Sequence, residues 1–422
     1  MDNEKLEKVL VVGGGGRVGY PFAQYCSYRG FDVKAYDRDP TSWIRAQNYV
    51  EADVPTCNRS VVASSDRNTY LDWIVSCEYM VIMIGTPIDA EGNPRIDGLY
   101  SIIDDIVEAL YRLKNSDGLQ KIMLKSIILR STVSPGTTNQ FDYLLNKKID
   151  LQFRSRFEVT FCPERISQGN TFKEMPILPQ LVGCLNDRAA AIGFFKKLTK
   201  EVIPLPIVSA ELGKLMTNMY RYVNFALANE FVQIAYHHNV DFEQLRNAIN
   251  KDYSRMDLPA AGPAAGPCLF KDGQFLVSHI PYTDLIRTSF TINEGFTNWI
   301  VDIIEEITYV SQARRVGILG MAFKANNDDT RYSLSFKLKK ILEAKGFEIV
   351  EYDPLVNSGS LPHKIPQCEV VVVMAPHDVF DGEFYSSFIN VGTVIIDIWR
   401  HFPESKLHKN GVYVKFESED KG

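Results

Sequence analysis

A glycine-rich run near the N-terminus has the spacing of a dinucleotide-binding turn. It fits the pattern G-x-G-x-x-G, and its residues are Gly14, Gly15, Gly16, Arg17, Val18 and Gly19. An apolar run at Lys8–Val12 precedes it, and helical spacing at Pro21–Arg29 follows it and ends at Gly30. Backbone N–H groups at the start of such a helix face a pyrophosphate, and glycine lets the phosphates come close. We therefore expect a dinucleotide site here rather than glycines that only make a tight turn.

An acidic residue follows the glycines at the distance that this motif requires. Asp37 ends a second apolar run, Phe31–Tyr36, about twenty residues further on. Its carboxylate can accept hydrogen bonds from the adenosine ribose and repels a 2′-phosphate, which favours NAD over NADP as the cofactor. The neighbouring Arg38 weakens that preference, since an arginine can accommodate the phosphate.

The elements that must position this site alternate between strands and helices, which predicts parallel sheets covered by helices. Further strand-like runs lie at Tyr79–Ile84, Ser126–Leu129, Glu158–Phe161, Arg315–Leu319, Phe347–Tyr352, Val370–Met374 and Thr393–Asp397. From Val208 to Asn250 apolar residues recur at three- and four-residue spacing, which predicts one long helix. A loop rich in proline, glycine and alanine follows at Pro259–Pro267. The pattern indicates an α/β domain, a helical connector and a second α/β domain.

Composition narrows the classes of function. A chain of 422 residues with 45% hydrophobic and 23% charged residues is typical of a globular protein of two or three domains. The net charge of -6 gives no support for nucleic-acid binding, and no apolar run is long enough to cross a bilayer. The polar N-terminus is unlike a signal peptide, and seven scattered cysteines without a C-x-x-C pair fit a reducing cytoplasm. No metal site is expected.

Six further segments share one order and spacing with a known family. They are Gly85-Thr86-Pro87, Ser131–Thr138, Cys162–Arg165, Glu211–Asn218, Cys268–Asp272, and Gly320–Lys324 running on to Asp329–Arg331. Together they resemble the UDP-glucose/GDP-mannose dehydrogenase family over about residues 8 to 400. A single segment of this kind is a weak signal, whereas six in order are specific.

The resemblance implies a complete architecture and activity. It predicts two Rossmann-like doubly wound domains joined by a central long-helix dimerisation domain. The expected divisions are residues 1–204 for NAD, 205–300 for the helical centre with the cysteine loop, and 301–422 for the UDP-sugar. The expected reaction is a four-electron oxidation of a sugar C6 alcohol with two NAD per turnover, in a homodimer or larger homo-oligomer.

An oxidation that continues from alcohol to carboxylate makes particular chemical demands. A base takes the hydroxyl proton as the first hydride leaves the carbon. The resulting aldehyde is a poor hydride donor, so a nucleophile must restore a tetrahedral carbon that bears an oxyanion, and a thiolate does this well. The second hydride then leaves a thioester, which water hydrolyses. The route needs a thiol, a donor or cation for the oxyanion, and a base for the water.

By resemblance, Cys268 is the nucleophile, and most of the other cysteines are expected to be inert buried thiols. Lys214 and Asn218 lie one helical turn apart, so both can point at one site, where they would hold the sugar and stabilise the oxyanion. Water and protons would be managed by Asp272, Glu164 and Thr132. A surface lysine is the alternative for Lys214, and a helix cap is the alternative for Glu164.

The remaining roles also come from the resemblance. The nicotinamide half of NAD would be lined by Thr86, Pro87 and Thr132, and Arg331 would contact NAD as well. The sugar nucleotide would contact Glu164, Arg165, Lys214, Asn218, Lys271, Phe323 and Lys324, with Arg255 reaching it from the partner subunit. Solvated surface charge is the alternative for Lys324 and Arg331.

The choice of sugar stays open at this level. Ala265-Gly266-Pro267 stands where the family usually has paired glycines and then Ser or His before the cysteine, which bears on the sugar pocket. Lys271-Asp272 favours UDP-glucose, with a UDP-N-acetylhexosamine second and GDP-mannose third. Two other classes remain: a two-electron hydroxy-acid dehydrogenase, which has no need of Cys268, and a non-catalytic sugar-nucleotide sensor, which would release no NADH.

Overall fold

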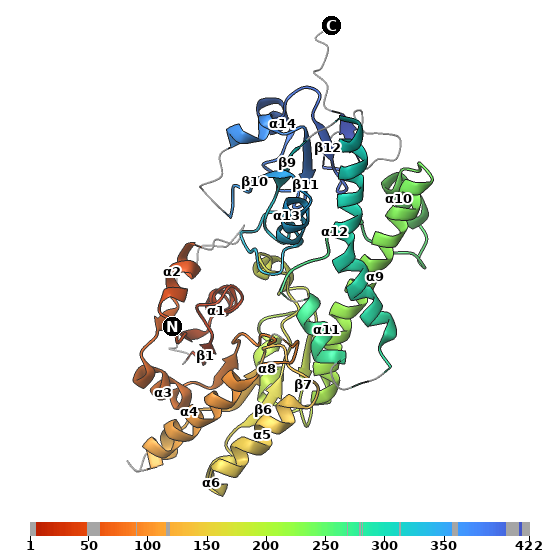
Figure 1. Cartoon of the computed structure of the whole chain (residues 1–422). Helices are drawn as coiled ribbons and strands as arrows, with labels where there is room; N and C mark the ends of the chain where they lie inside the picture. The colour runs from red at the N-terminus through yellow and green to blue at the C-terminus, as the bar shows by residue number, and fades with distance from the viewer. Residues whose placement is uncertain are drawn as a thin grey trace. The chain divides into compact units, whose positions relative to one another are not determined.

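The computed structural model describes most of the chain. The described residues are 6–48, 60–89, 91–114, 119–267, 269–277, 280, 282–311, 314–356, 362–401 and 413–415, so Cys268 lies outside them. The chain divides into two compact units, Met1–Thr217 with Gln274–His279, and Asn218–Gly273 with Ile280–Gly422. Figure 1 traces the chain through both units. The predicted division into three domains stays a prediction.

The first unit is built on a large, mostly parallel sheet. Its strands are β1 (Lys8–Val12), β2 (Asp32–Tyr36), β3 (Val62–Ser64), β4 (Tyr79–Ile82), β5 (Ser126–Leu129), β6 (Glu158–Phe161), β7 (Gln180–Gly183) and β8 (Val202–Leu205). Within the described residues the strand order is β3-β2-β1-β4-β5-β6-β7-β8. Only the pairing of β6 with β7 is antiparallel among the strand pairs described in this sheet. The order reverses between β1 and β4, which is where doubly wound sheets bind nucleotides.

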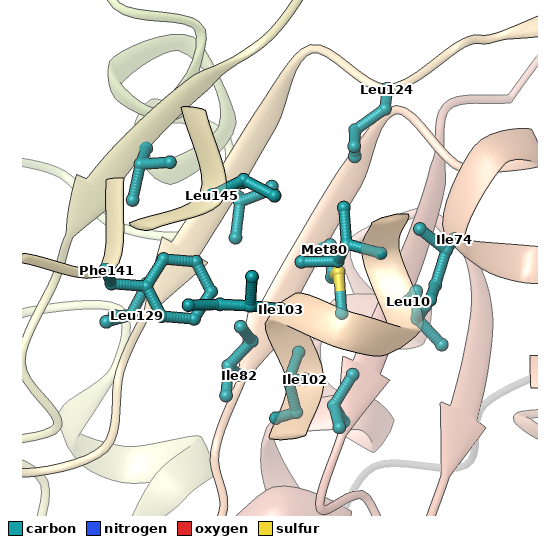
Figure 2. Close-up of a cluster of buried hydrophobic side chains, with 14 of the residues drawn as sticks. Leu10, Ile74, Met80, Ile82, Ile102, Ile103, Leu124, Leu129, Phe141 and Leu145 are labelled. Carbon is teal, nitrogen blue, oxygen red and sulfur yellow. The ribbon is translucent and has the colours of Figure 1, made fainter. Parts of the chain in front are cut away.

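Helices cover both faces of this sheet. They are α1 (Gly19–Tyr28), α2 (Thr41–Asn48), α3 (Arg67–Ser76), α4 (Asp97–Lys114), α5 (Thr137–Lys148), α6 (Leu151–Arg154), α7 (Thr171–Glu174), α8 (Ala190–Lys196) and a 3-10 turn, Leu119–Lys121. Leu10 and Val12 of β1 belong to the core under α3, α4 and α5, whereas Val9 and Val11 belong to the core under α1 and α8. Figure 2 shows the first of these cores, where Ile103 of α4 and Phe141 and Leu145 of α5 lie beside strand residues. The continuous apolar runs reflect strands that are buried on both faces.

The second unit combines long helices with a smaller sheet. Two helices belong partly to each unit, α9 (Ile207–His237) and α11 (Leu269–Val277). The other elements of this unit are α10 (Phe242–Asn250), α12 (Asp284–Ser311), β9 (Arg315–Leu319), α13 (Leu334–Ala344), β10 (Glu348–Tyr352), a 3-10 turn at Pro362–Gln367, β11 (Val370–Val373), α14 (Gly382–Phe388), β12 (Val394–Ile396) and β13 (Tyr413–Lys415). In the described residues the sheet order is β10-β9-β11-β12-β13, and only β13 pairs antiparallel. The core of this unit joins Val232 of α9 and Ile300 of α12 to Val316 and Val372 of the sheet. The prediction of two Rossmann-like sheets and a long central helix is confirmed.

The prediction of one helix from Val208 to Asn250 is wrong, because the chain breaks between α9 and α10. Asn239 takes the left-handed conformation at φ 54, which ends α9. Asp241 then caps α10, since its side chain accepts the backbone N–H of Gln244 at 3.0 Å. In the described part of the chain, neither α9 nor any other helix has both the length and the apolar character that a membrane crossing requires.

Candidate functional site

The predicted glycine turn joins β1 to α1. The N–H groups of Gly13 and Gly14 both donate to the Tyr36 carbonyl, at 2.8 and 2.9 Å, which folds the turn over the end of β2. A Cβ at Gly14 would lie 2.8 Å from the Ala35 Cβ, and one at Gly19 would lie 2.1 Å from the Gly13 carbonyl oxygen. Side chains at these positions would force helix and strand apart. The glycines are therefore required by close packing as well as by the ligand that the turn is shaped to hold.

Asp37 lies against this turn, as the sequence predicts. Its Oδ2 accepts the Gly15 N–H at 3.1 Å and its Oδ1 accepts the Asp39 N–H at 3.1 Å. A Cβ at Gly15 would lie 2.0 Å from the Ser42 Oγ, so this glycine has no room for a side chain. Arg17 is half-buried and Val18 is exposed at the start of α1, where the helix dipole favours an anion. The turn and the acid together fit the pyrophosphate and the adenosine ribose of a dinucleotide.

Thr86 and Thr132 come together at the same edge of the sheet. They follow β4 and β5, and the Thr86 Oγ1 donates to the Thr132 carbonyl at 2.7 Å. Thr86 is buried, Thr132 is half-buried and Pro87 is exposed. Because the carboxyl ends of neighbouring parallel strands meet at one edge, these residues share that edge with the glycine turn and Asp37.

Glu164 is held by a buried arginine that the sequence analysis did not single out. Arg130 follows β5, is 1% exposed, and bonds Glu164 through Nε at 3.0 Å and Nη2 at 2.9 Å. The guanidinium lies against the Phe22 ring at 4.9 Å and the Phe195 ring at 5.3 Å. Burial disfavours its charge, but the Glu164 carboxylate, together with Cys162 and Cys26, outweighs burial and holds the pKa of Arg130 above its usual value.

The second oxygen of Glu164 accepts a loop N–H, that of Ile166, at 2.8 Å. The nearest helix, α7, begins only at Thr171, so the alternative of a helix cap is wrong for Glu164. The next residue, Arg165, is half-buried and donates to the Pro179 carbonyl. Burial lowers the pKa of Arg165. Glu164 is thus a carboxylate in a fixed orientation with 16% of its side chain exposed.

The start of α9 is anchored by Glu211. This carboxylate is fully buried, and it accepts the N–H of Gly136 at 2.6 Å and the N–H and hydroxyl of Thr138 at 2.9 and 2.6 Å. Gly136 and Thr138 open α5, where free N–H groups and the helix dipole favour an anion. Glu211 therefore fixes the turn of α9 that carries Lys214.

Two predicted catalytic residues meet in the second unit. The Asn218 Nδ2 donates to the Asp272 Oδ2 at 2.6 Å, which joins α9 to α11. Asn218 is 7% exposed and Asp272 is 0% exposed. Lys214, one turn before Asn218 on α9, is 9% exposed, which excludes the alternative of a surface lysine. Lys271 beside Asp272 is half-buried.

The loop before Cys268 is buried against aromatic rings of the second unit. A Cβ at Gly266 would lie 2.5 Å from the Phe323 ring, and one at Gly262 would lie 2.3 Å from the Trp399 ring. The Gly266 N–H points to the Tyr332 carbonyl at 3.4 Å. The structure therefore places Phe323, a predicted substrate residue, against the cysteine loop.

The other predicted residues of the second unit are less enclosed. Lys324 is half-buried, with its ammonium 6.0 Å from the Phe323 ring centroid. Arg331 is exposed and forms an ion pair with Asp329 at 2.6 Å. Arg255 is exposed and lies 4.7 Å from the Tyr253 ring centroid. Their predicted roles stay predictions.

Five other cysteines lie in the described part of the chain, and all are buried free thiols: Cys26, Cys77, Cys162, Cys184 and Cys368. Burial raises the pKa of Cys77, Cys162 and Cys368 to about 12, and it also raises the pKa of Cys26 and Cys184. For these five, the prediction that the thiols are buried is confirmed, and the raised pKa values disfavour the reactive thiolate.

The second sheet has its own acid after a strand, Asp353 after β10. It is 1% exposed, and its Oδ2 accepts the N–H groups of Met321 and Ala322 at 2.7 and 2.9 Å. His377 accepts the Asn326 N–H on Nδ1 at 2.9 Å, so its ring proton lies on Nε2 and points at Asp353, 3.1 Å away. Burial raises the pKa of Asp353, but His377 and the N–H groups outweigh burial and lower it below its usual value.

We expect Asp353→Asn to destabilise the protein by about 1–3 kcal/mol at pH 7, because an amide cannot satisfy all of these donors. A carboxyl with a lowered folded-state pKa stabilises the fold above its unfolded pKa, and that stabilisation is lost as the pH falls through the folded pKa. The difference between wild type and Asp353→Asn should therefore shrink below about pH 4. Urea unfolding at pH 7, 5 and 3.5 measures it, and a difference that stays constant across this range would contradict the account.

Comparison with known proteins gives one family over most of the chain. Three sequence models of the UDP-glucose/GDP-mannose dehydrogenase family match it: the NAD binding domain at residues 7–202, the central domain at 208–294 and the UDP binding domain at 317–404. A UDP-N-acetyl-D-mannosamine dehydrogenase of Methanocaldococcus jannaschii is 27% identical over 90% of this chain and 88% of its own length. An NDP-N-acetyl-D-galactosaminuronic acid dehydrogenase of Ralstonia solanacearum is 25% identical over 79% of this chain and 80% of its own.

Solved structures agree with this result. The UDP-D-ManNAc dehydrogenase from Pyrococcus horikoshii superposes with a TM-score of 0.78 at 25% identity, covering 90% of this chain and 92% of that one. A UDP-glucose dehydrogenase from Pyrobaculum islandicum shares the fold, with a TM-score of 0.77 at 19% identity over 99% and 98% of the two chains. The chain belongs to the UDP-glucose/GDP-mannose dehydrogenase family and is an NAD-dependent nucleotide-sugar dehydrogenase.

Proposed function

We propose that this chain oxidises the C6 alcohol of a UDP-sugar to a carboxylate in two steps through a covalent intermediate on Cys268. The observation that carries the proposal is the buried 2.6 Å hydrogen bond between Asn218 and Asp272. It brings a predicted oxyanion donor together with a predicted base, and the base follows Cys268 by four residues in the sequence. A hydroxy-acid dehydrogenase would need neither this pair nor the thiol.

The cofactor is held by the glycine turn and Asp37, with Thr86 and Thr132 at the neighbouring strand ends. Side chains at Gly14 or Gly19 would collide with the backbone or with Ala35, so the turn retains the shape that a pyrophosphate requires. NAD, when bound, accepts a hydride from the sugar C6 in each of the two oxidations.

The residues of the chain supply the rest of the reaction. A base takes the C6 hydroxyl proton in the first oxidation, and the Cys268 thiolate then adds to the aldehyde carbon. Lys214 and Asn218 stabilise the resulting oxyanion. The second oxidation leaves a thioester, and Asp272 and Glu164 orient the water that attacks it and take its proton. The attack releases the carboxylate and restores the thiolate.

For the sugar, we propose UDP-N-acetyl-D-mannosamine first and UDP-glucose second. Two of the similar proteins described above act by name on UDP-N-acetyl-D-mannosamine, which supports the first. Lys271 supports the second, because the resemblance associates a lysine at this position with UDP-glucose.

The test is a parallel assay with UDP-N-acetylmannosamine, UDP-N-acetylglucosamine, UDP-glucose and GDP-mannose, in which NADH formed is counted against sugar consumed. We expect two NADH per sugar, and the highest kcat/KM with UDP-N-acetylmannosamine. One NADH per sugar would remove the need for the thioester step. No NADH with any sugar would favour the sensor.

We also propose that the chain forms a homodimer through α9. Tyr220, Leu227, Phe231 and Ile234 are 66%, 40%, 37% and 56% exposed and lie along one face of this helix. An exposed apolar stripe of this kind marks a protein interface. We expect a second copy of the chain to cover this stripe, because the resemblance to the family implies that α9 forms the dimer interface.

Phe231→Glu should therefore shift the wild-type dimer toward monomer, because a charge in the centre of an apolar interface must be desolvated. Light scattering after size exclusion measures the mass. Leu151→Glu is the matched control, since Leu151 is also apolar and 77% exposed but lies on α6. A wild-type monomer, or a Phe231→Glu variant of unchanged mass, would contradict the dimer.

A further inference from the structure

The segment that contains Cys268 is held at both ends by asparagines of α9. After the cysteine, Asp272 accepts a hydrogen bond from Asn218 at 2.6 Å. Before it, the Gly262 N–H donates to the Asn229 Oδ1 at 2.8 Å. Asn218 and Asn229 are eleven positions apart, and at about 100° per residue they lie within about 20° of each other around the helix. One face of α9 therefore fixes the chain on both sides of Cys268.

Asn229 is itself fixed by a second buried amide on α12. Its Nδ2 donates to the Asn293 Oδ1 at 3.0 Å, and the Asn293 Nδ2 donates to the Tyr222 carbonyl at 3.0 Å. Both asparagines are 0% exposed. Since the Asn229 oxygen accepts the Gly262 N–H, its amino group must face Asn293, which orients the second amide in turn. The chain of hydrogen bonds runs in one direction from the cysteine loop to the backbone of α9.

The loop between Gly262 and Cys268 has little freedom to absorb a shift. Pro263 and Pro267 lock their own φ angles. Gly262 and Gly266 take positive φ angles of 153° and 103°, and the rings that face them leave no room for a Cβ. A displacement at Gly262 is therefore passed along the loop toward the residue after Pro267.

We propose that Asn229 and Asn293 are positioning residues for the Cys268 thiol, and that losing them impairs the second oxidation far more than the first. The proposal rests on the proposed function. The first oxidation needs the base and the cofactor site. The second also needs the sulfur to donate an electron pair to the aldehyde C6 while the carbonyl oxygen takes the displaced pair. A misplaced sulfur delays this addition and lets the aldehyde leave.

The test compares Asn229→Ala and Asn293→Ala with wild type, using Asn250→Ala as the matched control. Asn250 lies in the same unit and also uses its whole side-chain amide to hold backbone. Its Nδ2 donates to the Leu258 carbonyl at 2.8 Å, and its Oδ1 accepts the Leu258 N–H at 3.0 Å. Single-turnover NADH is counted per sugar, and released aldehyde is trapped with semicarbazide. We expect wild type and Asn250→Ala to give two NADH, and Asn229→Ala to fall toward one with trapped aldehyde. The rate of the second hydride step should fall at least about tenfold more than that of the first.

Two further readouts keep the test decisive. Asn229→Asp retains an acceptor for the Gly262 N–H, so it should restore much of the stoichiometry. If Asn229→Ala does not fold, Asn293→Ala replaces it, because it removes the partner that orients the Asn229 amide and should also fall toward one NADH. The rate at which Cys268 is alkylated in the absence of substrate, measured by mass spectrometry of the peptide that carries it, should change in Asn229→Ala and not in Asn250→Ala. Two NADH from Asn229→Ala, or equal losses in both hydride steps, would overturn the proposal. One NADH from wild type would instead overturn the proposed function, and this proposal with it.

Discussion

Replacement of Cys268 by alanine is expected to stop the reaction at the aldehyde. The base and the cofactor site remain, so the first oxidation can proceed, but no nucleophile restores a tetrahedral carbon for the second. Turnover to the carboxylate should fall on the order of a thousandfold or more, as when the nucleophile of a covalent mechanism is removed. The measurement is NADH per sugar in a single turnover with aldehyde trapping, which should give one NADH and one trapped aldehyde.

Cys184→Ala is the matched control for this variant. Cys184 is a buried thiol, and burial raises its pKa, so we expect the Cys184→Ala variant to retain two NADH per sugar. A Cys268→Ala enzyme that still makes the carboxylate at a comparable rate would contradict the covalent route and favour two-electron chemistry.

Arg130→Met is expected to have the largest effect on stability. The Arg130 guanidinium lies among Cys162, Phe22 and Phe195, and its removal leaves the Glu164 carboxylate without its partner. Removing one partner of a buried ion pair costs about 3–5 kcal/mol. Hydrolysis of the thioester should also slow, because the Glu164 carboxylate that orients the water is then held, within the described residues, only through the hydrogen bond from the Ile166 N–H to its other oxygen. Urea unfolding measures the first effect, and the steady-state rate after a normal two-NADH burst measures the second.

A double-variant cycle separates the ion pair from simple loss of packing. Arg130→Met combined with Glu164→Gln should be destabilised by less than the sum of the two single variants, since the second change removes the charge that the first leaves unpaired. Additive effects would show that Arg130 contributes through its contacts with the two rings and not through Glu164.

The parts of the fold that the sequence predicts well are those set by local chemistry. The runs Lys8–Val12 and Ser126–Leu129 form strands with the predicted bounds, because a parallel strand buried on both faces must be apolar throughout. Short strands at the sheet margins escaped prediction. β3 is short and largely exposed, so it has no apolar run to distinguish it, and β8 is apolar but contains Pro204, which argues against a strand.

The break after α9 could not be read from periodicity. Leu245 and Ile249 continue the apolar spacing beyond His237, so the pattern alone extends the helix. The interruption depends on the left-handed Asn239 and on the cap that Asp241 provides, and both residue types also occur within helices. The sequence signal for a break was the pair Asn239 and Asp241 on either side of Val240, but the regular apolar spacing outweighed it.

Within the site, residues at strand ends were predictable and their supports were not. Thr86 and Thr132 follow strands whose carboxyl ends must share an edge, and the structure brings them together. Arg130 and Asn229 have no such local signal, since arginine and asparagine are mostly exposed and only tertiary packing reveals that these two are buried. Their partners Glu164 and Gly262 lie 34 and 33 positions further along the chain.

The most direct test of the covalent route is to look for the sugar on Cys268. Glu164→Gln slows water attack while leaving the thiol in place, so a reaction quenched in acid should retain the acyl intermediate. We expect a burst of two NADH per active site, slow turnover afterwards, and a uronyl adduct on the peptide that carries Cys268. A two-NADH burst with no adduct on that peptide, or with the adduct on another residue, would contradict it.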